Sequence, residues 1–267
     1  MTIYTLYFMA LAFFIPACAG LKQRESDRLI VLQQRYSGSI VRVIITEEDG
    51  AASSATSFYT GQQHGFLTAR HVFVSNDQTD NVVSISELML HIPSAVTGFS
   101  VEMGKPPSDD RDILGHYTSD WAAFKPTNDI LVRRPLVYDP ERYLRPGQDV
   151  YIAGYPGMDR DYVYSGVFPV EYIATRNLFI HKVKYIKLTI LPEGTGSFGI
   201  DTVKIPKNLP IAYGMSGGPV MIWDNAADDF VAVGLMIRDY SEVYQDIPML
   251  VFIRPRISNF GHHDDTN

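Results

Sequence analysis

Three short segments, far apart in the chain, carry side chains that together could cleave an amide bond. They are LTARHV, which contains His71, SDWAAFK, which contains Asp120, and GMSGGPV, which contains Ser216. A serine hydroxyl becomes a nucleophile when a histidine removes its proton, and a carboxylate beside the histidine holds the ring in the required tautomer. Each of these residues alone more often has a structural role. The prediction of nucleophilic catalysis therefore rests on their combination.

Glycines surround the serine of the third segment. Gly214, Gly217 and Gly218 allow a tight turn that presents the Ser216 hydroxyl outward. The same turn can aim the backbone N–H groups of Gly214 and Ser216 at one point, where charge would develop on a reacting carbonyl oxygen. We therefore expect Gly214 and Ser216 to form an oxyanion hole.

The residues before and after the histidine and the aspartate indicate how the chain positions them. His71 follows a strand-like run that ends at Thr68, so we expect its ring at a strand end. Asp120 precedes the apolar run Trp121–Phe124, which brings its carboxylate into or beside the core. A buried carboxylate requires a partner, and a histidine N–H would be one.

The residue pattern from Ser39 onward favours strands. Short runs rich in Val, Ile, Tyr and Phe are separated by Gly, Pro, Asn and Asp, a pattern typical of an all-β sandwich or barrel. The Pro-containing stretch 131–148 is the expected connection between two β halves. Helical periodicity is limited to the region around residues 24–35.

The order histidine, aspartate, serine distinguishes among hydrolase families. α/β-Hydrolases run Ser, Asp or Glu, His, and subtilisins run Asp, His, Ser. With its three motifs in this order, the chain resembles the trypsin-like (chymotrypsin-fold) serine proteases over residues 37 to 258. The segment AGYPG at 153–157 is similar to bacterial glutamyl endopeptidases, which favours a bacterial branch that includes the protease domains of the HtrA type.

This resemblance implies a fold of two six-stranded antiparallel β-barrels with the active site in the cleft between them. His71 and Asp120 would come from the first barrel (about 37–130) and Ser216 from the second (about 145–258). The implied activity is that of a serine endopeptidase acting on a protein or peptide, with no cofactor and no metal. The alternative is a catalytically weak or inactive protein of this fold that serves as an envelope binding or scaffold protein.

At several positions the chain differs from known members of this family, and these differences indicate how it would be activated and which substrates it would cleave. Secreted digestive members carry an aspartate before the nucleophile that pairs with a new N-terminus, whereas this chain has Met215. We therefore expect no activation through an N-terminal ion pair. Members that cleave after Lys or Arg have an aspartate where this chain has Pro210, and those that cleave after Glu use a histidine near Met236 and Ile237.

The expected substrate pocket is apolar and would accept a small or medium apolar P1 residue. Its lining is predicted to consist of Pro210, Ile211, Ala212, Tyr213, Met236 and Ile237.

The N-terminus is predicted to direct export to the medium, the periplasm or the cell envelope. Residues 1–19 include an uncharged apolar run that ends in Ala17-Cys18-Ala19, a pattern typical of a secretory signal peptide. Because the residues up to Cys18 also resemble a lipoprotein box, lipidation of Cys18 and an uncleaved anchor are alternatives. Residues 20–36 would be a spacer or a short helix, residues 37–260 the protease domain, and 261–267 a flexible tail.

Charge and cysteine content exclude other classes of function. The chain has 23 Lys and Arg against 30 Asp and Glu, a net charge of −7, which argues against sequence-independent binding of nucleic acid. Its single cysteine excludes an intramolecular disulfide and a cysteine-based zinc site. The acidic cluster 109–112 and the HHDD sequence at 262–265 favour solvated segments, so no metal site is predicted.

Overall fold

The structure is a computed structural model of the chain. It describes residues 26–47, 52–74, 85–90, 98–109, 112–127, 132, 134–155, 178–190, 198–205, 214–239 and 249–257. The predicted signal or anchor at 1–19 and the predicted tail at 261–267 lie outside this part of the chain.

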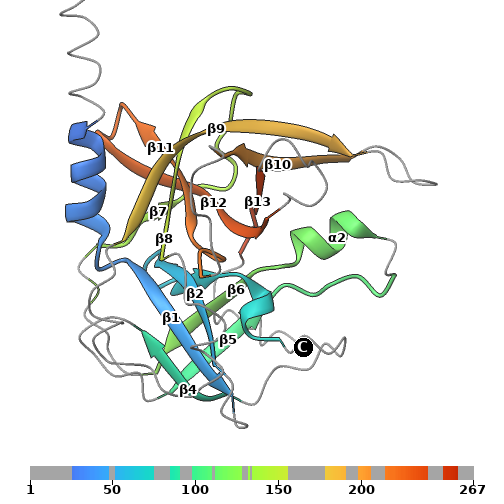
Figure 1. The fold of residues 1–267 in the computed structure, drawn as a ribbon. Helices are drawn as coiled ribbons and strands as arrows, with labels where there is room; N and C mark the ends of the chain where they lie inside the picture. Colours follow the sequence, from blue (N-terminus) through green and yellow to red (C-terminus); the bar gives the residue numbers. More distant parts are fainter. Residues whose placement is uncertain are drawn as a thin grey trace, which may run out of the picture.

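The first half of the chain forms a six-stranded antiparallel sheet, which lies in the lower part of Figure 1. Its strand order is β4-β1-β2-β3-β6-β5. The strands are β1 (Ile40–Glu47), β2 (Ala52–Tyr59), β3 (Phe66–Thr68), β4 (Ile85–Leu90), β5 (Phe99–Met103) and β6 (Ala122–Pro126).

The second half forms a closed six-stranded barrel. β11 pairs with both β8 and β12, which closes the strands β8-β9-β10-β13-β12-β11 into a ring. Its strands are β8 (Asp149–Gly154), β9 (Phe179–Ile190), β10 (Phe198–Lys204), β11 (Pro219–Asp224), β12 (Asp229–Asp239) and β13 (Met249–Ile253). The two-residue strand β7 (Val137–Tyr138) joins β12 in parallel, which the sequence did not predict. The predicted all-β architecture with six strands in each half is confirmed.

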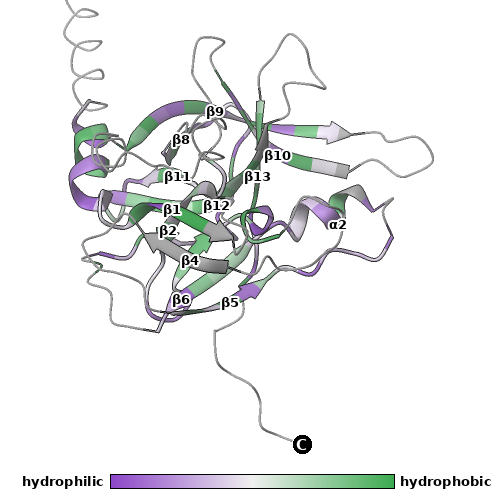
Figure 2. Ribbon diagram, turned by 60° about the horizontal axis from the view of Figure 1, so that its bottom comes forward, coloured by the Kyte–Doolittle hydropathy of each residue, from purple (hydrophilic) through white to green (hydrophobic). Residues whose placement is uncertain are grey.

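The burial pattern explains why these segments form strands. All five residues of β13 are buried, as expected for a strand covered on both faces. In β9, buried Val183 and Tyr185 alternate with exposed Lys184, and Figure 2 shows hydrophobic and hydrophilic residues alternating along this strand. In β9, the alternation of residue types along the sequence therefore corresponds to a buried face and a solvent-exposed face of the strand.

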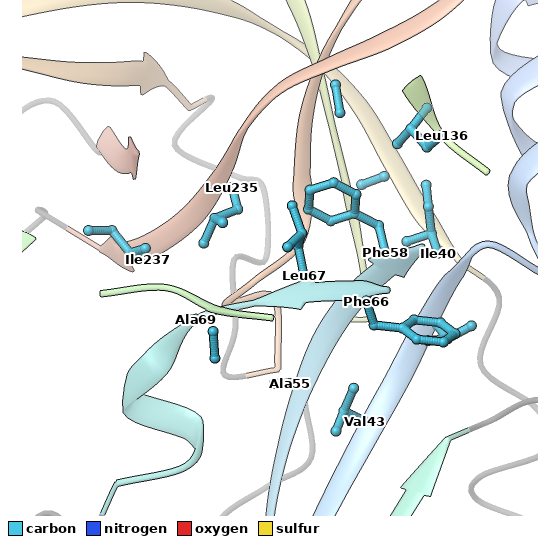
Figure 3. Close-up of a cluster of buried hydrophobic side chains, with 14 of the residues drawn as sticks. Ile40, Val43, Ala55, Phe58, Phe66, Leu67, Ala69, Leu136, Leu235 and Ile237 are labelled. Atoms are coloured by element: carbon cyan, nitrogen blue, oxygen red, sulfur yellow. The ribbon is translucent and has the colours of Figure 1, made fainter. Parts of the chain in front are cut away.

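One hydrophobic cluster is shared by the two halves. Leu67 of β3 and Ala69, just after this strand, belong to the same cluster as Leu235 and Ile237 of β12 (Figure 3). A second cluster, which includes Val220, fills the closed barrel. Because core residues from both halves pack together, the end of β3 is held against the second barrel.

Residues 26–36 form a helix that packs on the body of the protein, at the left edge of Figure 1. Leu32 and Tyr36 are fully buried in the shared cluster, and the Arg28 guanidinium lies 4.9 Å from the centre of the Trp223 ring. Burial, and then a hydrogen bond to Asp229, raise the pKa of the Tyr36 hydroxyl to about 12. Of the two alternatives for this stretch, the structure has a short helix.

Membrane-spanning character is not found in the helices of the described ranges. None of them combines the length and the apolar composition that crossing a bilayer requires.

The packing of this helix predicts a stability effect. Leu32→Ala removes a fully buried side chain and should lower the free energy of unfolding by about 2–5 kcal/mol. Ile30→Ala is the matched control on the same helix, because Ile30 is 47% exposed and its loss should cost about 0.5 kcal/mol or less. Urea denaturation of both variants tests this, and equal effects would mean that the helix is not part of the cooperative fold.

Candidate active site

His71 lies on a short 3-10 helix, η1 (Arg70–Val72), that starts two residues after β3. Val72, the last residue of η1, and Phe73, the residue after it, are buried, whereas the His71 side chain is 45% exposed. Burial of its neighbours fixes the backbone and leaves the ring at the surface. The predicted position of His71 at a strand end agrees with this geometry.

Asp120 lies between the helix α2 (Ile113–Thr118) and β6. The Asp112 carboxylate caps the start of α2 by accepting a hydrogen bond from the Gly115 N–H at 2.8 Å. At its other end the chain turns at Ser119, whose N–H donates to the Gly115 carbonyl at 3.0 Å. The helix and its exit turn deliver Asp120 to the start of the buried strand β6.

Asp120 holds His71 at two points. Its Oδ1 accepts a hydrogen bond from the His71 backbone N–H at 2.9 Å, and its Oδ2 lies 2.8 Å from the ring Nδ1. A carboxylate only accepts hydrogen bonds, so Nδ1 carries the proton in this contact. The neutral ring is then unprotonated at Nε2, the form that a general base requires.

Ser216 lies in a turn at the start of β11. Of residues 214–220, all of which the structure describes, Ser216 is the one that is not buried. The Gly218 N–H donates to the Met215 carbonyl at 2.9 Å, and the Gly217 N–H donates to the Met236 carbonyl of β12 at 2.6 Å. These bonds hold the turn to its own barrel and leave the serine accessible.

The serine turn packs directly against the first half of the protein. Gly217 has a φ of +81°, and a Cβ built on it would lie 2.1 Å from Thr68 Oγ1 and 2.3 Å from the Thr56 carbonyl oxygen. Thr68 precedes His71 by three residues, so this contact brings Ser216 into the neighbourhood of the histidine. No hydrogen bond joins the Ser216 hydroxyl to the His71 ring in the described part of the chain, and such contacts often tighten only around a substrate.

The predicted oxyanion donors belong to the same turn. Gly214 has a φ of +95°, a conformation that favours glycine. Because a peptide N–H points away from the carbonyl of the same peptide unit, the hydrogen bond to the Met215 carbonyl fixes the direction of the Ser216 N–H. Within the described residues, neither the Gly214 nor the Ser216 N–H donates to a protein acceptor.

Met215 and two of the predicted pocket residues are core residues. Met215 is 2% exposed and packs in the closed barrel, so its side chain has no ionic role. Met236 and Ile237 are equally buried, the former in the closed barrel and the latter in the shared cluster. The other predicted pocket residues, 210–213, lie outside the described residues. The apolar pocket therefore stays a prediction.

Thr56 of β2 is a residue of the site that the sequence did not indicate. Its N–H donates to the Ser216 carbonyl at 2.9 Å and its hydroxyl donates to the Gly214 carbonyl at 2.6 Å. It lies in the polar stretch ASSATS, where no pattern marks one hydroxyl as different from the others.

No group of three or more His, Cys, Asp or Glu side chains is placed to hold a metal ion in the part of the chain that the structure covers.

Comparison with known protein families and with curated proteins gives no match. Solved structures do match. The scabies mite inactivated protease paralogue S-I1 is 14% identical, with a TM-score of 0.51 over 82% of this chain and 90% of the other. The protease Anisep from Arthrobacter nicotinovorans is 14% identical, with a TM-score of 0.50 over 82% of this chain and 91% of the other. The chain therefore has the two-barrel, chymotrypsin-like fold of the trypsin-like serine proteases. Its placement in the glutamyl-endopeptidase branch stays a prediction.

The packing of the serine turn predicts different effects for two glycines with the same φ. Gly217 and Gly147 both have a φ of +81°, but a Cβ on Gly147 would meet nothing within 4 Å. Gly147→Ala should cost about 1–2 kcal/mol of stability, from backbone strain alone. Gly217→Ala should cost roughly 1–3 kcal/mol more, because the methyl group overlaps β2 and β3.

Denaturant titration of both variants measures this difference. Equal losses for the two glycines would show that the serine turn does not pack against β2 and β3.

Proposed function

We propose that this protein is a serine endopeptidase with His71, Asp120 and Ser216 as its catalytic triad. The observation that carries this proposal is the two-point contact between Asp120 and His71, beside a buried turn whose accessible residue is Ser216. The fold supports it, because His71 and Asp120 belong to the first half, Ser216 belongs to the second, and the serine turn packs against the first half.

In the proposed reaction, the Ser216 Oγ attacks the carbonyl carbon of the scissile peptide bond, and His71 Nε2 takes the hydroxyl proton. The tetrahedral intermediate collapses to an acyl-enzyme as the protonated His71 gives that proton to the leaving amine. Water then attacks the ester by the same route and releases the acid. Asp120 holds the ring orientation and stabilises its charged form.

The backbone N–H groups of Gly214 and Ser216 would stabilise the charge on the carbonyl oxygen. Each donor of this kind typically contributes about 10²–10³ in kcat. Their availability within the described residues supports this role.

The substrate would be a protein or peptide with an apolar P1 residue. Residues 210–213 together with Met236 and Ile237 would form the pocket. The absence of an acidic or histidine side chain among these six residues supports an apolar preference over Lys, Arg or Glu.

The enzyme would act outside the cytoplasm, either free or attached at Cys18. The uncharged apolar run within residues 1–19 supports export, and the residues before Cys18 support lipidation.

A second candidate function is that of an inactive protein of this fold, used for binding. The structural similarity to an inactivated protease paralogue shows that this fold does not by itself imply activity. The intact contact between His71 and Asp120 favours catalysis.

Covalent labelling separates the two candidates. We expect a fluorophosphonate probe to label the wild-type protein, because it reacts with an activated serine, and to leave Ser216→Ala unlabelled. Heat-denatured wild type is the control for nonspecific reaction, and peptide mass spectrometry locates the adduct. Labelling that persists in Ser216→Ala, or a wild type that does not react, would favour the binding protein.

The role of Asp120 predicts a selective kinetic loss. Asp120→Asn keeps the shape of the side chain but favours the wrong tautomer of His71, so kcat for a peptide substrate should fall by about 10⁴ with little change in KM. Asp139→Asn is the matched control, because among the described residues its carboxylate accepts only from the Glu141 N–H. A loss of less than tenfold in Asp120→Asn would remove Asp120 from the triad.

A further inference from the structure

We infer that Thr56 is a positioning residue for the oxyanion hole: its hydroxyl holds the Gly214 carbonyl, and through it the 214–216 segment, in the conformation that receives the oxyanion. This inference rests on the proposed function and adds to it a residue of β2, in the half of the protein opposite the nucleophile.

Thr56 holds both ends of the segment that supplies the two donors. Its hydroxyl lies 2.6 Å from the Gly214 carbonyl oxygen, and its backbone N–H donates to the Ser216 carbonyl at 2.9 Å. The middle carbonyl, that of Met215, accepts from the Gly218 N–H. All three successive carbonyls of the segment are therefore bonded, two of them to one residue of the other half.

The hydroxyl proton of Thr56 is committed to Gly214. The Tyr155 N–H donates to the same hydroxyl at 2.9 Å, so the oxygen acts there as an acceptor. A carbonyl only accepts, so the single hydroxyl proton points to Gly214. Thr56 is fully buried, so water does not compete for this bond.

Gly214 needs such an external restraint. With no side chain, glycine reaches many backbone conformations at low cost, and its φ of +95° lies among those that other residues avoid. A rotation of the backbone at Gly214 would redirect the N–H that the oxyanion hole uses. The Gly214 N–H belongs to the peptide unit before Gly214, and the hydrogen bond from Thr56 fixes the unit after it. The Gly214 Cα from which the N–H is directed is thereby held in place.

The space around the hydroxyl is shaped to keep this contact. A Cβ built on Gly154 would lie 2.9 Å from Thr56 Oγ1, so glycine at the end of β8 leaves room for it. Tyr155 is fixed by a hydrogen bond from its own hydroxyl to the Ile40 carbonyl at 3.0 Å. Burial raises the pKa of that phenol to about 12.

The test compares three variants on strand β2. Thr56→Val has nearly the same shape but no hydroxyl, and Thr56→Ser restores the hydroxyl. Ser57→Ala is the matched control, because it removes a buried hydroxyl on the next residue that bonds the Leu67 carbonyl within the first half alone, at 2.9 Å. Kinetics with a peptide substrate, normalised to active sites titrated with a fluorophosphonate, give kcat and KM for each.

We expect Thr56→Val to lower kcat about 10- to 100-fold with KM within a factor of two, which is less than outright loss of one donor. Its affinity for a peptide aldehyde, which forms a tetrahedral adduct with an oxyanion, should fall in parallel. Thr56→Ser should recover most of the loss, and Ser57→Ala should leave kcat unchanged.

If the wild type is active and Thr56→Val has the same kcat as Ser57→Ala, the inference is overturned and the proposed function is left intact. An unreactive wild type would overturn both. Should Thr56→Val not fold, Thr56→Cys replaces it, because a thiol is a weaker donor of similar size. A partial loss of kcat in that variant supports the inference, and wild-type kcat overturns it.

Discussion

The contact between strand β2 and the turn at 214–218 is the constraint on which the site depends. Thr56 bonds two carbonyls of this turn, and Gly217 packs without a side chain against Thr56 and Thr68. Since His71 follows Thr68 by three residues, the same contact that joins the two halves also places Ser216 in the neighbourhood of His71, its proposed base. Small residues and buried hydrogen bonds achieve this without a disulfide, which a chain with one cysteine cannot form.

The two halves would contribute different parts of the proposed chemistry. The first half holds the proposed acid–base pair, in which Asp120 contacts both the backbone and the ring of His71. The second holds the serine and the candidate oxyanion donors, anchored by β12 through the Met236 carbonyl. The hydrophobic cluster that includes Leu67 and Leu235 keeps these parts in register, because close packing across the boundary resists sliding of one half over the other.

The sequence predicts the parts of this structure that local patterns encode. Alternating and apolar runs indicate the strands, and the motifs around His71 and Asp120 predict a pair that the structure brings into contact. Thr56 could not be found in this way, because its partners Gly214 and Tyr155 lie 158 and 99 residues along the chain. For the same reason the sequence left open whether residues 26–36 pack on the body, which depends on distant partners such as Trp223.

In the proposed mechanism, Ser216 attacks a carbonyl whose oxygen is then held by two backbone N–H groups. A crystal structure of the protein with a peptide boronic acid tests it most directly, because boron forms a stable tetrahedral adduct with an activated serine. We expect a bond from boron to the Ser216 Oγ, with one boronate oxygen about 2.7–3.1 Å from the N–H nitrogens of Gly214 and Ser216. An adduct on another residue, or an oxygen directed away from both nitrogens, would contradict this mechanism.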